Sequence, residues 1–162
     1  MSKHIATVSW TSDGQFTSGR YSRAHDWQFD GGAIVRGSAS PGAVAPPMSD
    51  SAAVDPEEAL VASASSCHML WFLSLAQAAG YEIAAYRDEA EGRMGRDERG
   101  RIGFTGITLR PAISFAGTGP DADTLAGLHH QAHDKCFIAN SLHCAIAVEP
   151  APESASAPEQ QA

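Results

Sequence analysis

The stretch DPEEALVASASSCHMLWFLSLAQAAG, residues 55–80, carries the clearest structural information in this sequence. Asp55 can cap a helix, Pro56 suits the first helical position, and Glu58 stands three residues after the cap. Gly80 is a suitable end, because glycine readily adopts the left-handed conformation that terminates many helices. These residues predict a helix of about 24 residues, about 36 Å long at the usual rise.

The predicted helix is apolar on every side. Between Ala59 and Ala79 it holds no charged residue when His68 is neutral, so it must be covered all round. Its length would also span a bilayer, but its four serines, cysteine, histidine and glutamine favour a core helix without a membrane segment. Because a chain of 162 residues has little material to wrap such a helix, we expect two subunits to share this core in a homodimer.

Strand formers and turn residues predict the other elements. These are strands within 4–10 and 15–36, a turn at 30–32, an ordered proline-rich loop at 37–54, a long hairpin from 82–94 and 102–115, a helix from 121 to about 136, and a strand at 144–149. Pro111 indicates a bulge or an edge position in the hairpin. The order predicts an α+β fold with one domain over 1–149, followed by a disordered tail at 150–162.

Charge and composition exclude several classes of function. The net charge is −8, from 19 acidic and 11 basic residues without a basic cluster, so nucleic acid is not an expected partner. The sequence begins without a basic segment followed by an apolar one, so we expect no signal peptide and a cytoplasmic protein. In that compartment its three cysteines are expected to be mainly reduced.

Two of these cysteines are candidates for chemistry. Cys67 lies in the middle of the long helix after the small residues 62–66, which let a substrate approach the sulfur. Cys136 stands at the end of the second helix, and a thiol peroxidase needs a second thiol to condense with the sulfenic acid of the first. Their spacing of 69 residues leaves open whether they meet or are merely packed core residues. Cys144 is expected to be a core residue on a strand.

The segment from Asp55 to Cys67 resembles the signature of the OsmC/Ohr family, the osmotically inducible and organic hydroperoxide resistance proteins. That signature is asparagine or aspartate, proline, glutamate, glutamate or glutamine, and leucine, then small residues and a peroxidatic cysteine. Glu57 and Cys67 match its offset of ten residues, although Ala59 intervenes before Leu60. This departure affects the apolar position of the motif and leaves the cysteine in place.

A second mark of the family is a helix that ends in a cysteine followed by a short turn, matched by HDKCFIAN at 133–140. The order of elements also fits across residues 4–149. The resemblance implies intertwined subunits with central helices backed by strongly bent antiparallel sheets. It also implies reduction of organic hydroperoxides without metal or flavin: Cys67 attacks, Cys136 resolves the product as a disulfide, and dihydrolipoyl groups of lipoylated proteins reduce it.

The resemblance further implies an arginine, held by a glutamate, beside the peroxidatic sulfur. Such a partner is needed because an ordinary cysteine is mostly protonated at neutral pH and a buried thiolate is costly. Glu57 matches the glutamate, and the arginine candidates are Arg23, then Arg20, then Arg36. Ten residues of helix are about 15 Å. We therefore expect Glu57 of the partner subunit to complete the site of Cys67.

Two alternatives remain open at the level of sequence. Zinc binding would draw on the residues His129, His130, His133, Cys136, His143 and Cys144, which lie close together in sequence. Their spacing matches no zinc signature. A redox-inactive dimer of the same fold would merely pack its cysteines. If the protein is a peroxidase, the apolar residues Met69, Trp71 and Phe72 near Cys67 favour organic hydroperoxides over hydrogen peroxide.

Overall fold

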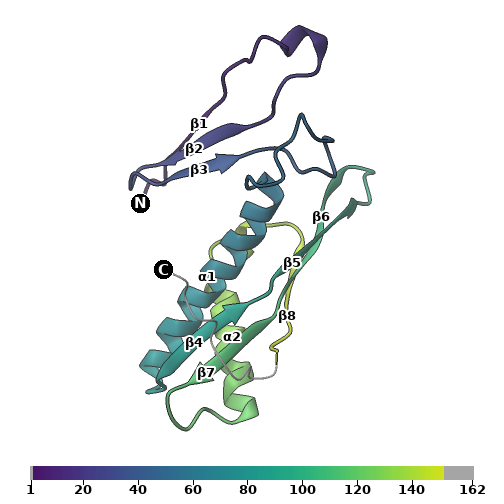
Figure 1. The fold of residues 1–162 in the computed structure, drawn as a ribbon. Coiled ribbons are helices and arrows are strands. Elements are labelled where there is room, and N and C mark those ends of the chain that lie inside the picture. Colours follow the sequence, from purple (N-terminus) through teal and green to yellow (C-terminus); the bar gives the residue numbers. More distant parts are fainter. Residues whose placement is uncertain (1, 152–162) are drawn as a thin grey trace. The chain divides into compact units, whose positions relative to one another are not determined.

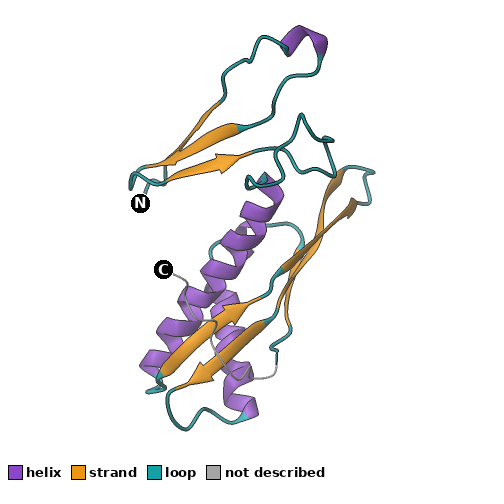
Figure 2. Ribbon diagram, in the orientation of Figure 1, coloured by secondary structure: helices purple, strands orange, loops and turns teal. Residues whose placement is uncertain are grey.

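The computed structural model describes residues 2–151 and divides the chain into two compact units, Met1–Leu60 and Val61–Ala162. Figures 1 and 2 show helices and strands in the order expected of an α+β fold. The disordered tail predicted at 150–162 lies outside the described residues from 152 onward, and it stays a prediction together with the single domain over 1–149.

The first unit contains an antiparallel sheet in the order β1-β2-β3. Its elements are β1 (Ala6–Ser9), the short 3-10 helix η1 (Phe16–Ser18), β2 (His25–Phe29) and β3 (Ile34–Gly37). The turn between β2 and β3 closes where the Gly32 amide donates to the Phe29 carbonyl at 2.9 Å. The strands and the turn predicted in this part of the chain are therefore confirmed.

The proline-rich loop after β3 is ordered, as predicted. The Ser38 amide donates to the Val54 carbonyl at 3.1 Å, and the Val54 amide donates to the Arg36 carbonyl at 3.0 Å. The buried Ser38 hydroxyl also accepts a hydrogen bond from the Asp50 amide at 2.9 Å. These bonds bring the end of the loop back to β3, just before the long helix begins.

The long helix α1 (Pro56–Ala78) begins and ends where its terminal residues predict. The Asp55 carboxylate accepts from the Glu58 amide at 2.7 Å, and the Glu58 carboxylate accepts from the Asp55 amide at 3.2 Å. This reciprocal pair satisfies two amides that the helix itself leaves free. At the other end Gly80 has φ +85°, and the Tyr81 amide donates to the Ala76 carbonyl at 3.0 Å.

A single chain buries only one stripe of α1. The fully covered residues Ala64, His68, Phe72 and Ala76 recur every four positions, which is the spacing of one helix face. Leu70, on another face, is 61% exposed. By length and composition α1 would also suit a membrane, but the buried stripe is what a core helix presents. The predicted homodimer would bury the apolar side chains of α1 that stay exposed in one chain, and it remains a prediction.

The hairpin after α1 differs from the two long strands predicted at 82–94 and 102–115. Each is broken, giving β4 (Ile83–Asp88), β5 (Glu91–Arg96), β6 (Ile102–Leu109) and β7 (Pro111–Phe115). β4 pairs with β7 and β5 with β6, so the hairpin itself is confirmed.

The break in the hairpin coincides with Pro111 and with a contact between Arg110 and Asp88. Pro111 has no amide hydrogen to donate, and it stands at the first position of β7. Beside it the Arg110 amide donates to the Asp88 side chain at 2.6 Å in place of a strand partner. The position of Pro111 at an irregularity was predicted, whereas the extent of the break was not.

The C-terminal elements follow the predicted order. They are α2 (Ala122–Lys135), the 3-10 helix η2 (Ala139–Ser141) and β8 (Ala145–Val148). The Asp121 carboxylate caps α2 by accepting from the Thr124 amide at 2.8 Å. β8 runs parallel to β6 and completes a sheet in the order β5-β6-β8.

Two apolar clusters hold the second unit together. One joins α1 and α2 to the β4–β7 pair through Phe72, Ala76, Ile113, Leu128 and Ala132. Both helices thus pack on the same face of that pair, as Figure 1 shows. The other cluster joins Ala64 of α1 to Ile107 and Leu109 of β6. The α1 turn that carries residues 67 and 68 lies between these clusters.

Candidate functional site

The structure brings Cys67 and Cys136 together. Cys67 is half-buried in the middle of α1, and Cys136, at the C-terminal cap of α2, is only 1% exposed. The side chains of the two residues are hydrogen-bonded to each other, and both thiols are free. Helix packing thus brings together two thiols that are 69 residues apart in sequence.

The two thiols differ in their surroundings. Burial, followed by the hydrogen bond with Cys67, raises the pKa of the Cys136 thiol to about 11. The Ala139 amide, 3.4 Å from the Cys136 sulfur, opposes this change because it favours the anion. Cys136 therefore stays protonated at neutral pH.

An aromatic pair borders the thiols. Trp71, one helical turn after Cys67, contacts Phe137, the neighbour of Cys136, edge to face at 5.7 Å between ring centroids. Phe137 is 69% exposed, and the Lys135 ammonium lies 5.5 Å from the centre of the Trp71 ring. The dithiol thus has an accessible apolar border that carries one positive charge.

Phe72 does not share in this border. It is fully buried in the core of the second unit and stacks on His129 at 4.4 Å between ring centroids. Of the aromatic residues expected near the sulfur, Trp71 lies beside the thiol pair and Phe72 belongs to the core. A helical wheel explains the difference, because Phe72 is in register with the buried stripe of Ala64 and His68.

A second polar pair, which sequence reasoning missed, lies next to the first. His68 and His129 are 1% and 4% exposed, their rings stack at 5.4 Å, and His68 Nε2 is 3.1 Å from His129 Nδ1. Burial lowers the pKa of each histidine to about 4, so both are neutral at pH 7. The one available signal was the place of His68 on a helix without any polar face.

The zinc alternative receives no support from the geometry. The His129 ring is turned to His68, the Cys136 thiol to Cys67, and the exposed His130 lies 3.5 Å from the Asp134 carboxylate. In the part of the chain from 2 to 151, no three His, Cys, Asp or Glu side chains are grouped so that they could hold a metal ion. Cys144, just before β8, packs against the second apolar cluster.

The favoured arginine makes local contacts within the first unit. The Arg23 guanidinium lies 3.6 Å from the centre of the Tyr21 ring and donates to the carbonyl oxygens of Tyr21 and Gly19. The Arg23 amide donates to the Met48 carbonyl at 2.8 Å. These contacts fix the direction in which the half-buried arginine points from the segment before β2.

The remaining predicted residues also belong to the first unit. Arg20 is exposed, and Arg36 forms a cross-strand ion pair with Asp26 at 3.5 Å. Glu57 is the second residue of α1 and is half-exposed. The thiols belong to the second unit. A role of these residues at Cys67 therefore stays a prediction.

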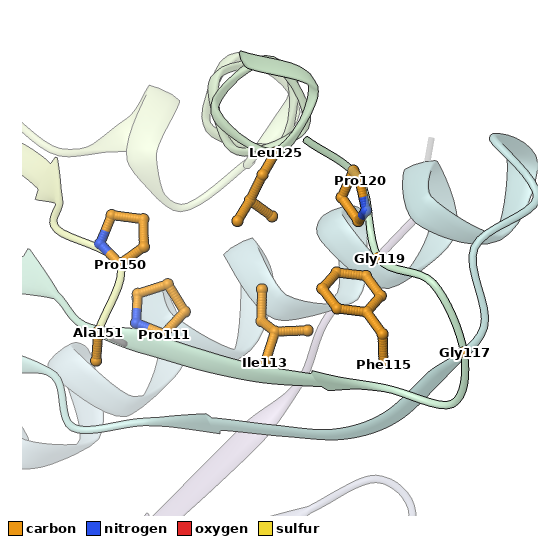
Figure 3. Close-up of a pocket in the computed structure, with 9 residues that line it drawn as sticks. All are labelled: Pro111, Ile113, Phe115, Gly117, Gly119, Pro120, Leu125, Pro150 and Ala151. Atoms are coloured by element: carbon orange, nitrogen blue, oxygen red, sulfur yellow. The ribbon is translucent and has the colours of Figure 1, made fainter. Parts of the chain in front are cut away.

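Two cavities lie apart from the thiols. The cavity in Figure 3, about 330 Å³ in volume, is enclosed by β7, the segment before α2 and residues 150–151. Its lining residues are Pro111, Ile113, Phe115, Gly117, Gly119, Pro120, Leu125, Pro150 and Ala151. None of these nine carries a titratable or nucleophilic side chain. The second cavity, about 280 Å³, is lined by His129, His130, His133, Ile146 and Val148.

Comparisons with known proteins identify the fold. The chain is 46% identical to an OsmC-like protein of unknown function from Vibrio cholerae, with 93% of this chain and 100% of that chain covered and a TM-score of 0.91. An organic hydroperoxide resistance protein from Elizabethkingia anophelis is 18% identical, with 96% and 98% covered and a TM-score of 0.69. The organic hydroperoxide resistance protein OhrB of Bacillus subtilis is 20% identical, with 92% and 98% covered and a TM-score of 0.62.

The two structures below 25% identity show a shared fold only. No protein with a curated description matches the sequence. The family model described as OsmC-like protein matches residues 49–151, the range that holds α1, both thiols and the whole of the second unit as described. The family resemblance and the α+β fold inferred from sequence are thereby confirmed: this chain belongs to the OsmC-like protein family.

Proposed function

We propose that this protein is a thiol-dependent peroxidase that reduces organic hydroperoxides. The Cys67 thiolate attacks the outer peroxide oxygen, which breaks the O–O bond and yields a Cys67 sulfenic acid; the alkoxide that leaves takes up a proton from water and is released as the alcohol. The Cys136 thiol then attacks the Cys67 sulfur, which forms the disulfide and releases water. The observation that carries this proposal is the hydrogen-bonded pair of free thiols between α1 and α2.

The assignment of the two roles follows from exposure. Cys67 is half-buried, so a peroxide can reach its sulfur, whereas Cys136 is 1% exposed and stays protonated at neutral pH. A buried, protonated thiol is a poor first nucleophile. Cys136 is therefore assigned the second step, the attack on the oxidised Cys67.

The border of the site favours organic substrates. The exposed edge formed by Trp71 and Phe137 offers apolar surface for a substituent on the peroxide. Hydrogen peroxide has no such substituent and gains nothing from this contact. Two of the compared structures carry the name organic hydroperoxide resistance protein, which agrees with this substrate class.

The proposed site also includes a homodimer and a charged pair, Arg23 and Glu57. The apolar surface of α1 that one chain leaves uncovered is the expected interface, and Glu57 of the partner subunit would hold Arg23 beside Cys67. Lipoylated proteins are the proposed reductant and the cytoplasm the proposed compartment. Arg23→Ala should then slow peroxide attack about 10-fold or more, and Arg20→Ala and Arg36→Ala, the other two candidates, are measured beside it. Equal rates in Arg23→Ala and wild type would move the role to Arg20 or Arg36, and equal rates in all three variants would contradict the arginine model.

The decisive test is stopped-flow oxidation of the reduced protein with cumene hydroperoxide and hydrogen peroxide in parallel. We expect one equivalent of cumene hydroperoxide to consume two thiols, and to do so faster than hydrogen peroxide. Peptide mapping should locate the new bond between Cys67 and Cys136. Thiols that stay reduced with both peroxides would contradict the proposal and favour a redox-inactive member of the fold.

A further inference from the structure

The buried pair of His68 and His129 is unusual in its surroundings. It lies beside the apolar cluster that joins α1, α2 and the β4–β7 pair, and Phe72 of that cluster stacks against the His129 ring. His68 Nδ1 and His129 Nε2 are both buried and find no hydrogen-bond partner among the described residues. Buried polar atoms are nearly always paired, so an arrangement that leaves two of them unpaired calls for an explanation.

The hydrogen bond between the rings is well defined chemically. A neutral imidazole carries one proton, so one ring nitrogen donates and the other accepts. Since both histidines are neutral, one proton lies between His68 Nε2 and His129 Nδ1, and either ring can supply it. Two charged or titratable groups act on the pKa of His68: His133 of α2 lowers it, and Asp88 of β4 raises it. Neither contacts the shared proton.

The position of this bond relates it to the thiols. His68 follows Cys67 directly on α1, and His129 lies seven residues, about two turns, before Cys136 on the same side of α2. The two pairs therefore join the same two helices at neighbouring points. Apolar contacts are not directional, so they tolerate a helix that slides or rotates slightly, whereas a hydrogen bond requires a narrow range of distance and angle.

We propose that the His68–His129 hydrogen bond is a positioning device that fixes α1 against α2, so that the Cys136 sulfur stays in line with the oxidised Cys67. The inference rests on the proposed peroxidase function, because the step it governs is the attack of the Cys136 thiol on the Cys67 sulfenic acid. That step forms the S–S bond and releases water. Among the described residues each ring makes its hydrogen bond to the other ring and none to a sulfur, so the histidines are positioning residues.

The test uses replacements that keep or remove the one polar atom in question. His129→Asn places an amide atom where Nδ1 stands, and His68→Gln places one where Nε2 stands, whereas His129→Leu removes the polar atom. We expect His129→Leu to slow disulfide formation about 10-fold to 100-fold, as a small misalignment of reacting groups does. His129→Asn, alone or combined with His68→Gln, should keep most of the wild-type rate.

Two measurements separate positioning from a merely structural role. In His129→Leu the second-order rate of sulfenic acid formation should equal that of wild type, while the sulfenic acid survives longer and is trapped in higher yield by dimedone. Oxidation by diamide, which needs no peroxide, should show the same slow closure of the Cys67–Cys136 bond. Circular dichroism and thermal unfolding identify any variant that has lost its fold. If His129→Leu has done so, the closure rate of His129→Asn is compared with that of wild type.

The possible outcomes are distinct. Equal closure rates in His129→Leu and wild type, or in the leucine and asparagine variants, would overturn the positioning role. A parallel loss of sulfenic acid formation and closure would show a general structural effect and would overturn it as well. Failure of wild-type protein to form any sulfenic acid would reject the peroxidase proposal instead, and the diamide rates would still decide whether the histidines align the thiols.

Discussion

Two pairs of side chains, adjacent along the same helix interface, behave in opposite ways. Cys67 and Cys136 form a contact with one half-buried and one buried member, whereas His68 and His129 are both buried. The thiol pair borders an accessible aromatic edge that includes Phe137. The histidine pair is covered by the apolar side chains that hold the helices together.

The difference shows how neighbouring residues on a helix acquire separate tasks. A step of one residue rotates a side chain by about 100°. Cys67 therefore lies at the edge of the buried stripe, while His68 lies at its centre with Ala64 and Phe72. Access decides which pair can react, and burial decides which pair can fix a geometry. The predictions below test this division in order of the expected effect.

The largest effect is expected at the reactive pair. Cys67→Ser should abolish peroxide consumption because it removes the accessible nucleophile. Cys136→Ser should still consume one equivalent and then stop or overoxidise, because the sulfenic acid has lost its partner. Peroxide consumption and intact mass after each addition provide the measurement. Undiminished turnover by Cys67→Ser would show that the accessible thiol is not the nucleophile.

A second effect concerns the buried pair and acid. The folded state holds the pKa of His68 and His129 at about 4, below the ordinary 6.5. The unfolded chain therefore takes up protons first, and stability falls as the pH drops from 6.5 towards 4. We expect a loss of about 2 kcal/mol per histidine between pH 7 and pH 5.

Urea unfolding at the two pH values measures this loss. The double variant His68→Leu/His129→Leu, in which nothing titrates at these positions, should show a smaller dependence on pH in this range. If wild type and double variant lose the same amount of stability, the two histidines are not buried as neutral groups.

A smaller effect of opposite direction is expected from the thiol pair. The pKa of Cys136 is raised from 9.0 to about 11, so the unfolded chain ionises first as the pH rises. The stability that the protonated thiol contributes is fully present below pH 9 and is lost towards pH 11, by about 1 kcal/mol at pH 10. Cys136→Ser should reduce the loss of stability above pH 9 and leave the loss between pH 7 and pH 5 unchanged. An equal loss of stability above pH 9 in wild type and in that variant would contradict the burial of Cys136.

Much of the fold follows from interactions that act within a few residues. The caps of α1 lie at Asp55, Glu58 and Gly80, and each can be found in the sequence because capping partners are near neighbours. The same holds for Asp121 at the start of α2. The hairpin was found as a pair, but its break depends on a side chain, Asp88, that meets an amide 22 residues away.

The candidate site divides in the same way. The sequence by itself determined the two helices, the placement of Cys67 and Cys136 on them, and the family motifs around both. Only the tertiary structure decided that the two sulfurs meet, that Phe72 faces the core, and that His68 pairs with His129 across 61 residues. The physical reason is that α1 is apolar all round, so its composition does not show which face is buried. The strands and α2, which pack on that face, determine it.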